Sequence, residues 1–398
     1  PAWARGGPGT PTPTTQRGPG STPTILWEYP VGTAAITGMP ILADRGGETI
    51  AYVGAHDGRF VGVWVTGPKA GTLAVEVQLD GIVWGTAAVD ADGTVFIGTD
   101  SDQLVALAPD GTRRFSLRLG ACDPPRAPGP VGVRCDVDGG PTLALDGDLY
   151  VGADAVYRIT RTGEIRWRYA APEPAAETGE ATDTDDAAPP PVLEHVFAAP
   201  VVTRAGDVYV GTEGLGLVAL DANGGERWRV ELAGDVDGAP AIGSDGMIYV
   251  GDDGGRVTAI RPTGTVLWSV PVGGSVRSAI TLDDQGTLYV SSLGGQVHAI
   301  SPRGLIDWTF TAGGPVQATP VIDAAGVIYF GGQDEHLYAI ARGGALRWQL
   351  EIPAQVDSAV AVVEGVLVFG ADDGMLRAVA NAATSAPGRG TAPDGAER

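Results

Sequence analysis

The sequence predicts an all-β protein, an eight-bladed β-propeller with four antiparallel strands in each blade. Three observations support this prediction. Tryptophan recurs at intervals of forty residues, at Trp228, Trp268, Trp308 and Trp348. Between these tryptophans the hydrophobic residues alternate with a period of two, as in β-strands. Glycine makes up 61 of the 398 residues, which suits a protein with many turns. A repeat near forty residues is typical of one supersecondary unit stacked on its copies.

One copy of the repeat shows the order of its elements. From Ala239 onward, APAIG, MIYVG, RVTAI and VLWSV are four runs rich in β-branched and aromatic residues. The segments between them are SDG, DDGG and PTG, whose glycines allow the tight turns of a β-meander. We therefore expect four antiparallel strands. A single meander would bury one face poorly, so its copies must pack on one another.

Eight copies follow this plan. They begin near Met39, Thr86, Gly140, Ala199, Ala239, Ala279, Thr319 and Ala359. In the fourth strand, the first copy has Val75 and the second has Phe115 where the others have Trp. The last copy ends after three strands near Asn381, whereas ILWEY at 25–29 is spelled like a fourth strand. We expect this N-terminal strand to complete the last blade, which closes the ring and removes its open edges.

The predicted propeller is one domain over residues 25–381, with insertions at 120–137 and 170–192. Residues 1–24 are rich in Pro, Gly and Thr, and we expect them to form a flexible tether, as does the tail at 382–398. The sequence begins with Pro1, and a secretory signal peptide is the natural candidate for a segment before it.

The phrase A-[LI]-x-x-x-G-x-x-x-W, which follows [LIV]-Y-V-G and a Gly-rich turn, resembles the tryptophan-docking repeat of quinoprotein-like β-propellers. That family includes dehydrogenases that carry pyrroloquinoline quinone and a non-enzymatic propeller lipoprotein of the bacterial outer-membrane barrel assembly machinery. The resemblance covers about Ile25 to Asn381. It implies that the repeated tryptophans pack between neighbouring blades. These residues are Trp27, Trp167, Trp228, Trp268, Trp308 and Trp348.

Composition excludes some classes of partner. The formal net charge of −22 disfavours nucleic acid, because phosphates would be repelled. No run of about twenty apolar residues is present, so no transmembrane segment is predicted.

The only cysteines, Cys122 and Cys135, flank a Pro- and Gly-rich loop in the first insertion. A local disulfide is the favoured prediction, and a pair of free thiols in a cytosolic protein is the alternative. The second insertion is acidic, with almost no apolar side chains, and is expected to be mobile. Both insertions join an outermost strand to the next innermost strand, so they should emerge on one face. A partner-docking site there is one hypothesis, and tolerated loop growth is the other.

Alignment of the copies shows one variable position beside constant neighbours, just before each innermost strand. Its occupants are Thr37, Trp84, Asp138, Phe197, Asp237, Arg277, Gln317 and Asp357. We call these the channel-mouth residues, because they should ring one end of the central channel. They could hold a small polar ligand or an extended peptide, or form a hydrated funnel that binds nothing.

No catalytic or metal-binding residues are assigned. In the quinone-dependent dehydrogenases, the cofactor lies between a Trp and a disulfide of neighbouring cysteines, above Ca²⁺. Cys122 and Cys135 are thirteen positions apart, and the insertions that build that site are absent. The four histidines, His56, His195, His298 and His336, lack a short ligand spacing. The segments DADG at 90–93 and DGD at 146–148 are interpreted as turns rather than Ca²⁺ loops.

We therefore predict a non-enzymatic, extracytoplasmic scaffold, periplasmic or associated with the outer membrane. It would bind a protein or peptide partner of the cell envelope, with no cofactor and no metal. The alternative is a ligand-sensing or pyrroloquinoline-quinone-binding redox propeller that uses the channel mouth.

Overall fold

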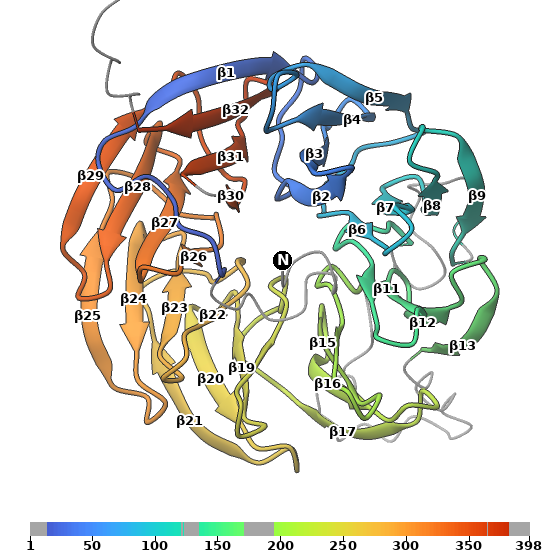
Figure 1. Cartoon of the computed structure of the whole chain (residues 1–398). Coiled ribbons are helices and arrows are strands. Elements are labelled where there is room, and N and C mark those ends of the chain that lie inside the picture. Colours follow the sequence, from blue (N-terminus) through green and yellow to red (C-terminus); the bar gives the residue numbers. More distant parts are fainter. Residues whose placement is uncertain (1–13, 121, 123–134, 171–194, 364, 382–398) are drawn as a thin grey trace, which may run out of the picture.

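The computed structural model describes residues 14–120, 122, 135–170, 195–363 and 365–381. All regular elements in these ranges are strands, so they include no helix that could cross a membrane. The strands form eight four-stranded antiparallel sheets around a central axis (Figure 1). The predicted all-β, eight-bladed propeller is thus confirmed.

The strands of the first four blades are as follows. Blade 1 contains β2 (Ile41–Arg45), β3 (Glu48–Gly54), β4 (Arg59–Trp64) and β5 (Leu73–Gln78). Blade 2 contains β6 (Ala88–Val89), β7 (Val95–Thr99), β8 (Gln103–Leu107) and β9 (Arg113–Arg118). Blade 3 contains β10 (Thr142–Leu143), β11 (Leu149–Gly152), β12 (Val156–Ile159) and β13 (Ile165–Tyr169). Blade 4 contains β14 (Val201–Val202), β15 (Val208–Thr212), β16 (Gly216–Leu220) and β17 (Glu226–Val230).

The other four blades complete the ring. Blade 5 contains β18 (Ala241–Ile242), β19 (Ile248–Gly251), β20 (Arg256–Ile260) and β21 (Val266–Pro271). Blade 6 contains β22 (Thr281–Leu282), β23 (Leu288–Ser291), β24 (Gln296–Ile300) and β25 (Ile306–Thr311). Blade 7 contains β26 (Val321–Ile322), β27 (Val327–Gly332), β28 (His336–Ala341) and β29 (Leu346–Glu351). Blade 8 contains β30 (Ala361–Val363), β31 (Val366–Gly370), β32 (Met375–Ala380) and β1 (Thr24–Pro30).

The N-terminal strand closes the ring as predicted. β1 pairs antiparallel with β32, from Thr24 opposite Ala380 to Pro30 opposite Met375. In each blade, the pairing between the third and fourth strands shifts register beside the Trp position, as between Ala259 and Ile260. Such a β-bulge twists the outer strand locally. The sequence alone did not reveal it.

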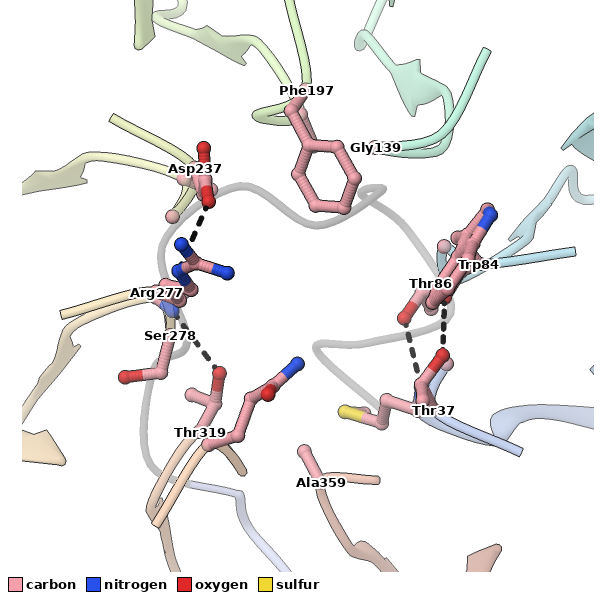
Figure 2. A pocket seen from close by; sticks show the side chains of 18 of the residues that line it. Thr37, Trp84, Thr86, Gly139, Phe197, Asp237, Arg277, Ser278, Thr319 and Ala359 are labelled. Carbon is pink, nitrogen blue, oxygen red and sulfur yellow. Dashed lines mark hydrogen bonds and ion pairs between the residues drawn. The ribbon is translucent and has the colours of Figure 1, made fainter. Parts of the chain in front are cut away.

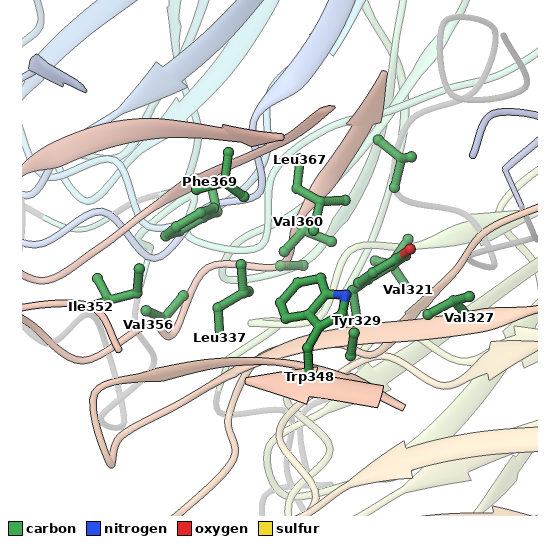
Figure 3. Close-up of a cluster of buried hydrophobic side chains, with 14 of the residues drawn as sticks. Val321, Val327, Tyr329, Leu337, Trp348, Ile352, Val356, Val360, Leu367 and Phe369 are labelled. Atoms are coloured by element: carbon green, nitrogen blue, oxygen red, sulfur yellow. The ribbon is translucent and has the colours of Figure 1, made fainter. Parts of the chain in front are cut away.

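The hydrophobic core is divided among the interfaces between blades. Each of eight buried clusters draws its side chains from two adjacent blades, including one that joins blade 8 to blade 1. Figure 3 shows one of them, where Trp348 and Tyr329 of blade 7 face Val360 and Leu367 of blade 8. The copies therefore bury their faces against one another, as the repeat predicted.

The repeated tryptophans link each blade to the next. The indole Nε1 of Trp268, in β21, donates a hydrogen bond of 3.0 Å to the Pro302 carbonyl in the turn before β25. Trp228 and Trp308 make the same contact with Pro262 at 2.9 Å and Arg342 at 2.8 Å. The turn must approach closely, because a Cβ on Gly264 would lie 2.8 Å from the Trp228 ring. Its φ of +84° also favours glycine.

The N-terminal segment differs from its prediction as a flexible tether up to residue 24. Its described part, from residue 14, is bound to blades 7 and 8. The Thr14 amide donates to the Ile322 carbonyl at 3.0 Å, and the Ser21 hydroxyl donates to the Asn381 side chain at 3.0 Å. The Pro19 carbonyl accepts the Trp348 indole N–H at 3.3 Å. Blade 8 takes its fourth strand from the N-terminus, so this incoming segment supplies the carbonyl that a turn supplies elsewhere.

Two tryptophans allow the contribution of the indole hydrogen bond to be measured. Trp268 Nε1 has its acceptor, whereas the buried Nε1 of Trp27 has no hydrogen-bond partner among the described residues. Replacing Trp268 by Phe should therefore lower the free energy of unfolding by about 1 kcal/mol more than the same change at Trp27. Urea unfolding of the two variants measures this difference. Equal losses would show that the indole N–H contributes nothing to blade docking.

Candidate functional site

The eight channel-mouth residues line one cavity of about 190 Å³ at the centre of the ring (Figure 2). Each stands four residues before the first residue of its blade's innermost strand. They are Thr37, Trp84, Asp138, Phe197, Asp237, Arg277, Gln317 and Asp357. The structure thus brings together every residue of the predicted set, while their binding role stays a prediction.

The residue before each of these positions explains their orientation. It is a buried Val or Ile, with an exposed fraction of 0% at Val236 and Val276. Val276 fits against Gly251 in β19 of the preceding blade, where a Cβ would overlap the valine side chain. Because this side chain is fixed between two blades, the next one along the connection is directed toward the channel. The repeat therefore presents a variable side chain from a constant support.

One side of the cavity carries ionised groups. Arg277 forms a bidentate pair with Asp253, with Nε–Oδ1 and Nη2–Oδ2 distances of 3.0 and 2.7 Å. Its Nε also lies 3.5 Å from Asp237 Oδ2. Burial, followed by the charge of Asp253, raises the pKa of Asp237 to about 6. A single guanidinium is thus shared by two carboxylates.

Another pair of carboxyls, those of Asp357 and Asp372, lies at the boundary between blades 7 and 8. Gln333 Nε2 donates to both oxygens of Asp357, at 3.1 and 3.2 Å. Burial raises the pKa of Asp357 above its ordinary value. Burial and the charges of Asp357 and Asp373 raise the pKa of Asp372 to about 6. Asp357 and Asp372 therefore repel each other when both are ionised, and Asp372 takes up a proton as pH falls below neutral.

The opposite side of the cavity is aromatic. The Trp84 ring centroid lies 4.0 Å from that of the His56 imidazole, which is hydrogen-bonded to the Thr37 hydroxyl at 2.9 Å. Burial lowers the pKa of His56, so this imidazole is neutral at pH 7. Phe197 projects into the cavity from the blade 4 side (Figure 2). The lining thus combines acidic and aromatic walls.

A buried cluster beside the cavity is not apparent from the sequence. Asp136, Asp138 and His195 have possible ligand atoms within 4.8 Å of one another. His195 Nε2 is bonded to the Asp136 carbonyl at 3.0 Å, and Nδ1 lies 3.6 Å from Glu213 Oε1. The cluster unites residues from both sides of the second insertion, so no short spacing in the sequence could reveal it.

The charge state of His195 distinguishes an ion-pair cluster from a metal centre. Burial lowers the pKa of His195, but the nearby Glu213 carboxylate, the Asp136 carbonyl and the Asp138 charge outweigh it and raise the pKa overall. The surrounding acids therefore favour the imidazolium form more than they would for a free histidine, and an imidazolium has no lone pair for a metal. We interpret the cluster as a buried cation surrounded by acids.

This assignment predicts a pH dependence of stability. The folded-state pKa of His195 is raised above 6.5, so its contribution is complete below pH 6.5 and is lost as pH rises through the folded value. His195→Gln should cost about 1 to 3 kcal/mol in acid, and less as pH increases. Urea unfolding of the parent protein and the His195→Gln variant, at pH values below and above 6.5, measures this difference.

His298→Gln is the matched control. Burial lowers the pKa of His298, so its contribution is present above pH 6.5 and is lost as pH falls through the lower folded value. The loss of unfolding free energy caused by His298→Gln should therefore become smaller as pH falls, whereas the loss caused by His195→Gln becomes smaller as pH rises. The same pH trend for both variants would contradict the ion-pair interpretation.

The two insertions meet the described structure beside the cavity. Cys122 and Cys135 form a disulfide with a Cα–Cα distance of 5.9 Å, which confirms that prediction. Asp138 follows Cys135 by three residues. The acidic insertion lies outside the described residues, apart from its first residue, Ala170. Its mobility and its docking role therefore stay predictions.

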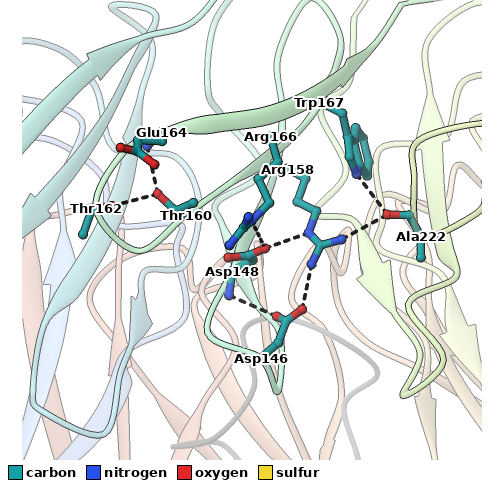
Figure 4. Close-up of polar contacts among 9 residues, drawn as sticks. All are labelled: Asp146, Asp148, Arg158, Thr160, Thr162, Glu164, Arg166, Trp167 and Ala222. Carbon is teal, nitrogen blue, oxygen red and sulfur yellow. Dashed lines mark hydrogen bonds and ion pairs between the residues drawn. The ribbon is translucent and has the colours of Figure 1, made fainter.

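The aspartates of the DGD segment serve a structural purpose. Arg158 pairs with Asp146 and Asp148 at 2.8 Å each, and Arg166 reaches Asp148 at 2.6 Å (Figure 4). Arg158 also donates to the Ala222 carbonyl, which accepts the Trp167 indole. In DADG, the Asp92 carboxylate accepts the Thr94 amide at 2.9 Å. The acids thus close turns and hold Arg158, which together with Trp167 joins blade 3 to blade 4 at the Ala222 carbonyl.

Solved structures of similar fold include one assembly factor and two dehydrogenases. BamB from Moraxella catarrhalis matches with a TM-score of 0.64 and 18% identity, covering 92% of this chain and 99% of that one. A europium-containing methanol dehydrogenase matches with a TM-score of 0.74 and 13% identity, covering 93% and 96%. Quinohemoprotein alcohol dehydrogenase from Comamonas testosteroni matches with 0.70 and 13%, covering 94% and 79%. At these identities, the likeness shows the fold alone.

Similarity at the level of the sequence is more specific. No curated protein matches the chain. The profile of the family described as outer membrane protein assembly factor BamB matches residues 46–184, 155–261 and 253–383. These segments together span most of the propeller. The chain therefore belongs to the family of the outer membrane protein assembly factor BamB.

Proposed function

We propose that this propeller is a non-enzymatic scaffold that binds a protein or an extended peptide through the face bearing the channel mouth. One observation carries the proposal: the occupants of one repeated position vary from blade to blade and line a single cavity, whereas the neighbouring positions are alike. Closure of the ring alone would not require a different residue at this position in each blade. The family match supports the scaffold class.

We also propose an extracytoplasmic location in the cell envelope. The disulfide between Cys122 and Cys135 supports it, because such bonds persist in oxidising compartments. The similarity to an outer membrane assembly factor points the same way. Fractionation of cells that produce the protein from its native gene tests the location, and recovery in the cytosol would contradict it.

Photo-crosslinking tests the binding face. A benzoylphenylalanine placed at Gln317, on the cavity lining, should give discrete protein adducts in cells. The same group at Asp245 is the control, because Asp245 lies in the exposed turn between β18 and β19, at the opposite end of the innermost strand from the channel-mouth residue. Adducts at both positions or at neither would overturn the proposed face. Deleting residues 170–192 in the Gln317 variant then shows whether the acidic insertion contributes, because an unchanged adduct pattern would remove it from the binding site.

The second candidate is a redox propeller that binds pyrroloquinoline quinone, which the dehydrogenases of similar fold keep open as an alternative. The lining fits this tricarboxylate poorly. Three of its residues, Asp138, Asp237 and Asp357, are acids, and Arg277 is already paired with Asp253. The cysteines form a bond across thirteen positions rather than a pair of neighbours.

A titration with pyrroloquinoline quinone and Ca²⁺ distinguishes the two candidates. The scaffold proposal expects no stoichiometric binding. Tight binding that is lost in Trp84→Ala would replace the scaffold proposal with the redox one.

A further inference from the structure

We propose that the group entering this cavity is a basic side chain, a lysine ammonium or an arginine guanidinium carried on an extended segment of the partner protein. This inference rests on the proposed function and specifies the chemistry of the partner. It follows from the charges of the lining, from the turns around it and from its aromatic wall.

The charge of the cavity lining is unbalanced. Asp237 and Asp357 contribute carboxylates, Asp138 adds a third that is buried beside His195, and Arg277 is the one basic side chain among the described lining residues. This guanidinium lies between Asp237 and Asp253, both within 3.5 Å, so its charge is already compensated. Asp357 accepts its hydrogen bonds from the neutral amide of Gln333. A cation that approaches Asp357 would therefore neutralise a carboxylate that has no cationic partner in these contacts, and it would not compete with Arg277.

The turns around the cavity extend this acidic surface. The turns between second and third strands open on the same face as the channel mouth, as the contacts from Asp253 to Arg277 and from Gln333 to Asp357 show. In seven of the eight blades such a turn contains an acid. Representative residues are Asp57, Asp100, Asp154, Glu213, Asp253, Asp334 and Asp372. Asp154 and Asp253 are paired with Arg168 and Arg277, and the acids that remain in excess attract basic segments and repel acidic ones.

The aromatic wall suits the same ligand. Trp84 and Phe197 line the cavity. An ammonium or guanidinium group is attracted to an aromatic face, and a guanidinium also stacks on it. Thr37 and Gln317 add neutral polar groups to the rim. A basic side chain can thus contact a carboxylate with its charged end and an aromatic ring with its alkyl stem.

The acid groups also give the interaction a pH dependence. Asp237 faces Asp253, Arg277, Glu213 and Asp235, and its pKa is about 6 because burial and neighbouring acids disfavour its charge. Asp372 faces Asp357 and Asp373 and has a pKa of about 6 for the same reason. A bound cation favours the ionised carboxyls, so affinity should fall as pH decreases through 6.

Calorimetric titration of the full chain tests the inference. The probe is a capped pentapeptide of glycines with one central arginine, and its comparison peptide has citrulline, which is neutral and of nearly the same shape. The arginine peptide should bind at least about tenfold more tightly. Asp237→Asn combined with Asp357→Asn should reduce its affinity about tenfold, whereas Asp245→Asn on the opposite face should not change it. Unchanged thermal unfolding confirms that the variants are folded.

The outcomes separate this inference from the proposed function. If the arginine and citrulline peptides bind equally, the proposal that a basic side chain enters the cavity is wrong. The scaffold proposal still holds if benzoylphenylalanine at position 317 crosslinks to a protein. If those crosslinks are absent as well, both the basic-side-chain inference and the scaffold proposal are wrong. Tighter binding of spermidine than of the arginine peptide would assign the cavity to a free polyamine and overturn the protein segment.

Discussion

Replacing Trp348 by Ala is expected to lower the free energy of unfolding by about 4 kcal/mol. Trp348 is only 4% exposed and is the most buried of the repeated tryptophans. It packs against Tyr329, Leu337 and Val360 in the cluster between blades 7 and 8. Alanine would leave a cavity at that interface, and the Pro19 carbonyl would lose its indole donor.

Urea unfolding followed by tryptophan fluorescence measures this loss. Leu305→Ala provides the control, because Leu305 is 64% exposed and its removal should change stability by less than about 0.5 kcal/mol. Trp348→Phe should retain much of the packing and cost less than the alanine variant. If Trp348→Ala and Leu305→Ala unfold at the same urea concentration, the tryptophans do not hold the blades together.

Removing the disulfide by Cys122→Ala and Cys135→Ala is expected to cost about 3 kcal/mol, mainly because the unfolded chain gains freedom. The bond joins cysteines thirteen residues apart in the sequence, and both are buried. The loop ends immediately before Asp136, so the bond also restrains the segment that brings Asp138 to the cavity.

Unfolding with and without dithiothreitol measures the contribution of the disulfide. The reductant should destabilise the parent protein by the same amount as the double substitution and should leave the double variant unchanged. A double variant as stable as the oxidised parent would show that the bond is dispensable for the fold.

The channel-mouth cavity also shows which features of a site can be predicted from a sequence repeat and which cannot. Alignment of the copies locates all eight channel-mouth residues, because each lies four residues before an innermost strand. Their partners come from other turns. Asp253 with Arg277, and Gln333 with Asp357, become neighbours only when adjacent blades dock.

The N-terminal segment gives a second example. Residues 14–23 have no hydrophobic period, so their composition indicates a tether. Their contacts use mainly backbone groups, such as the Thr14 amide and the Pro19 carbonyl, which any sequence provides. The closed ring explains why residues 14–23 are bound. Blade 8 takes its fourth strand from the N-terminus, so it has no turn whose carbonyl could accept the Trp348 indole N–H, and Pro19 provides that carbonyl instead.

The number of blades, the order of their strands and the residues at the channel mouth can all be predicted from the sequence. These features repeat locally, through strand alternation, turn glycines and a Trp every forty residues. In contrast, the docking of the blades is needed to show how His195 meets Asp136, which acid neutralises Arg277 and where the N-terminal segment binds. Most of these contacts join residues far apart along the chain, whose sequence neighbours carry no sign of the partner. Their electrostatic energies also depend on distances and burial that arise only in the packed protein.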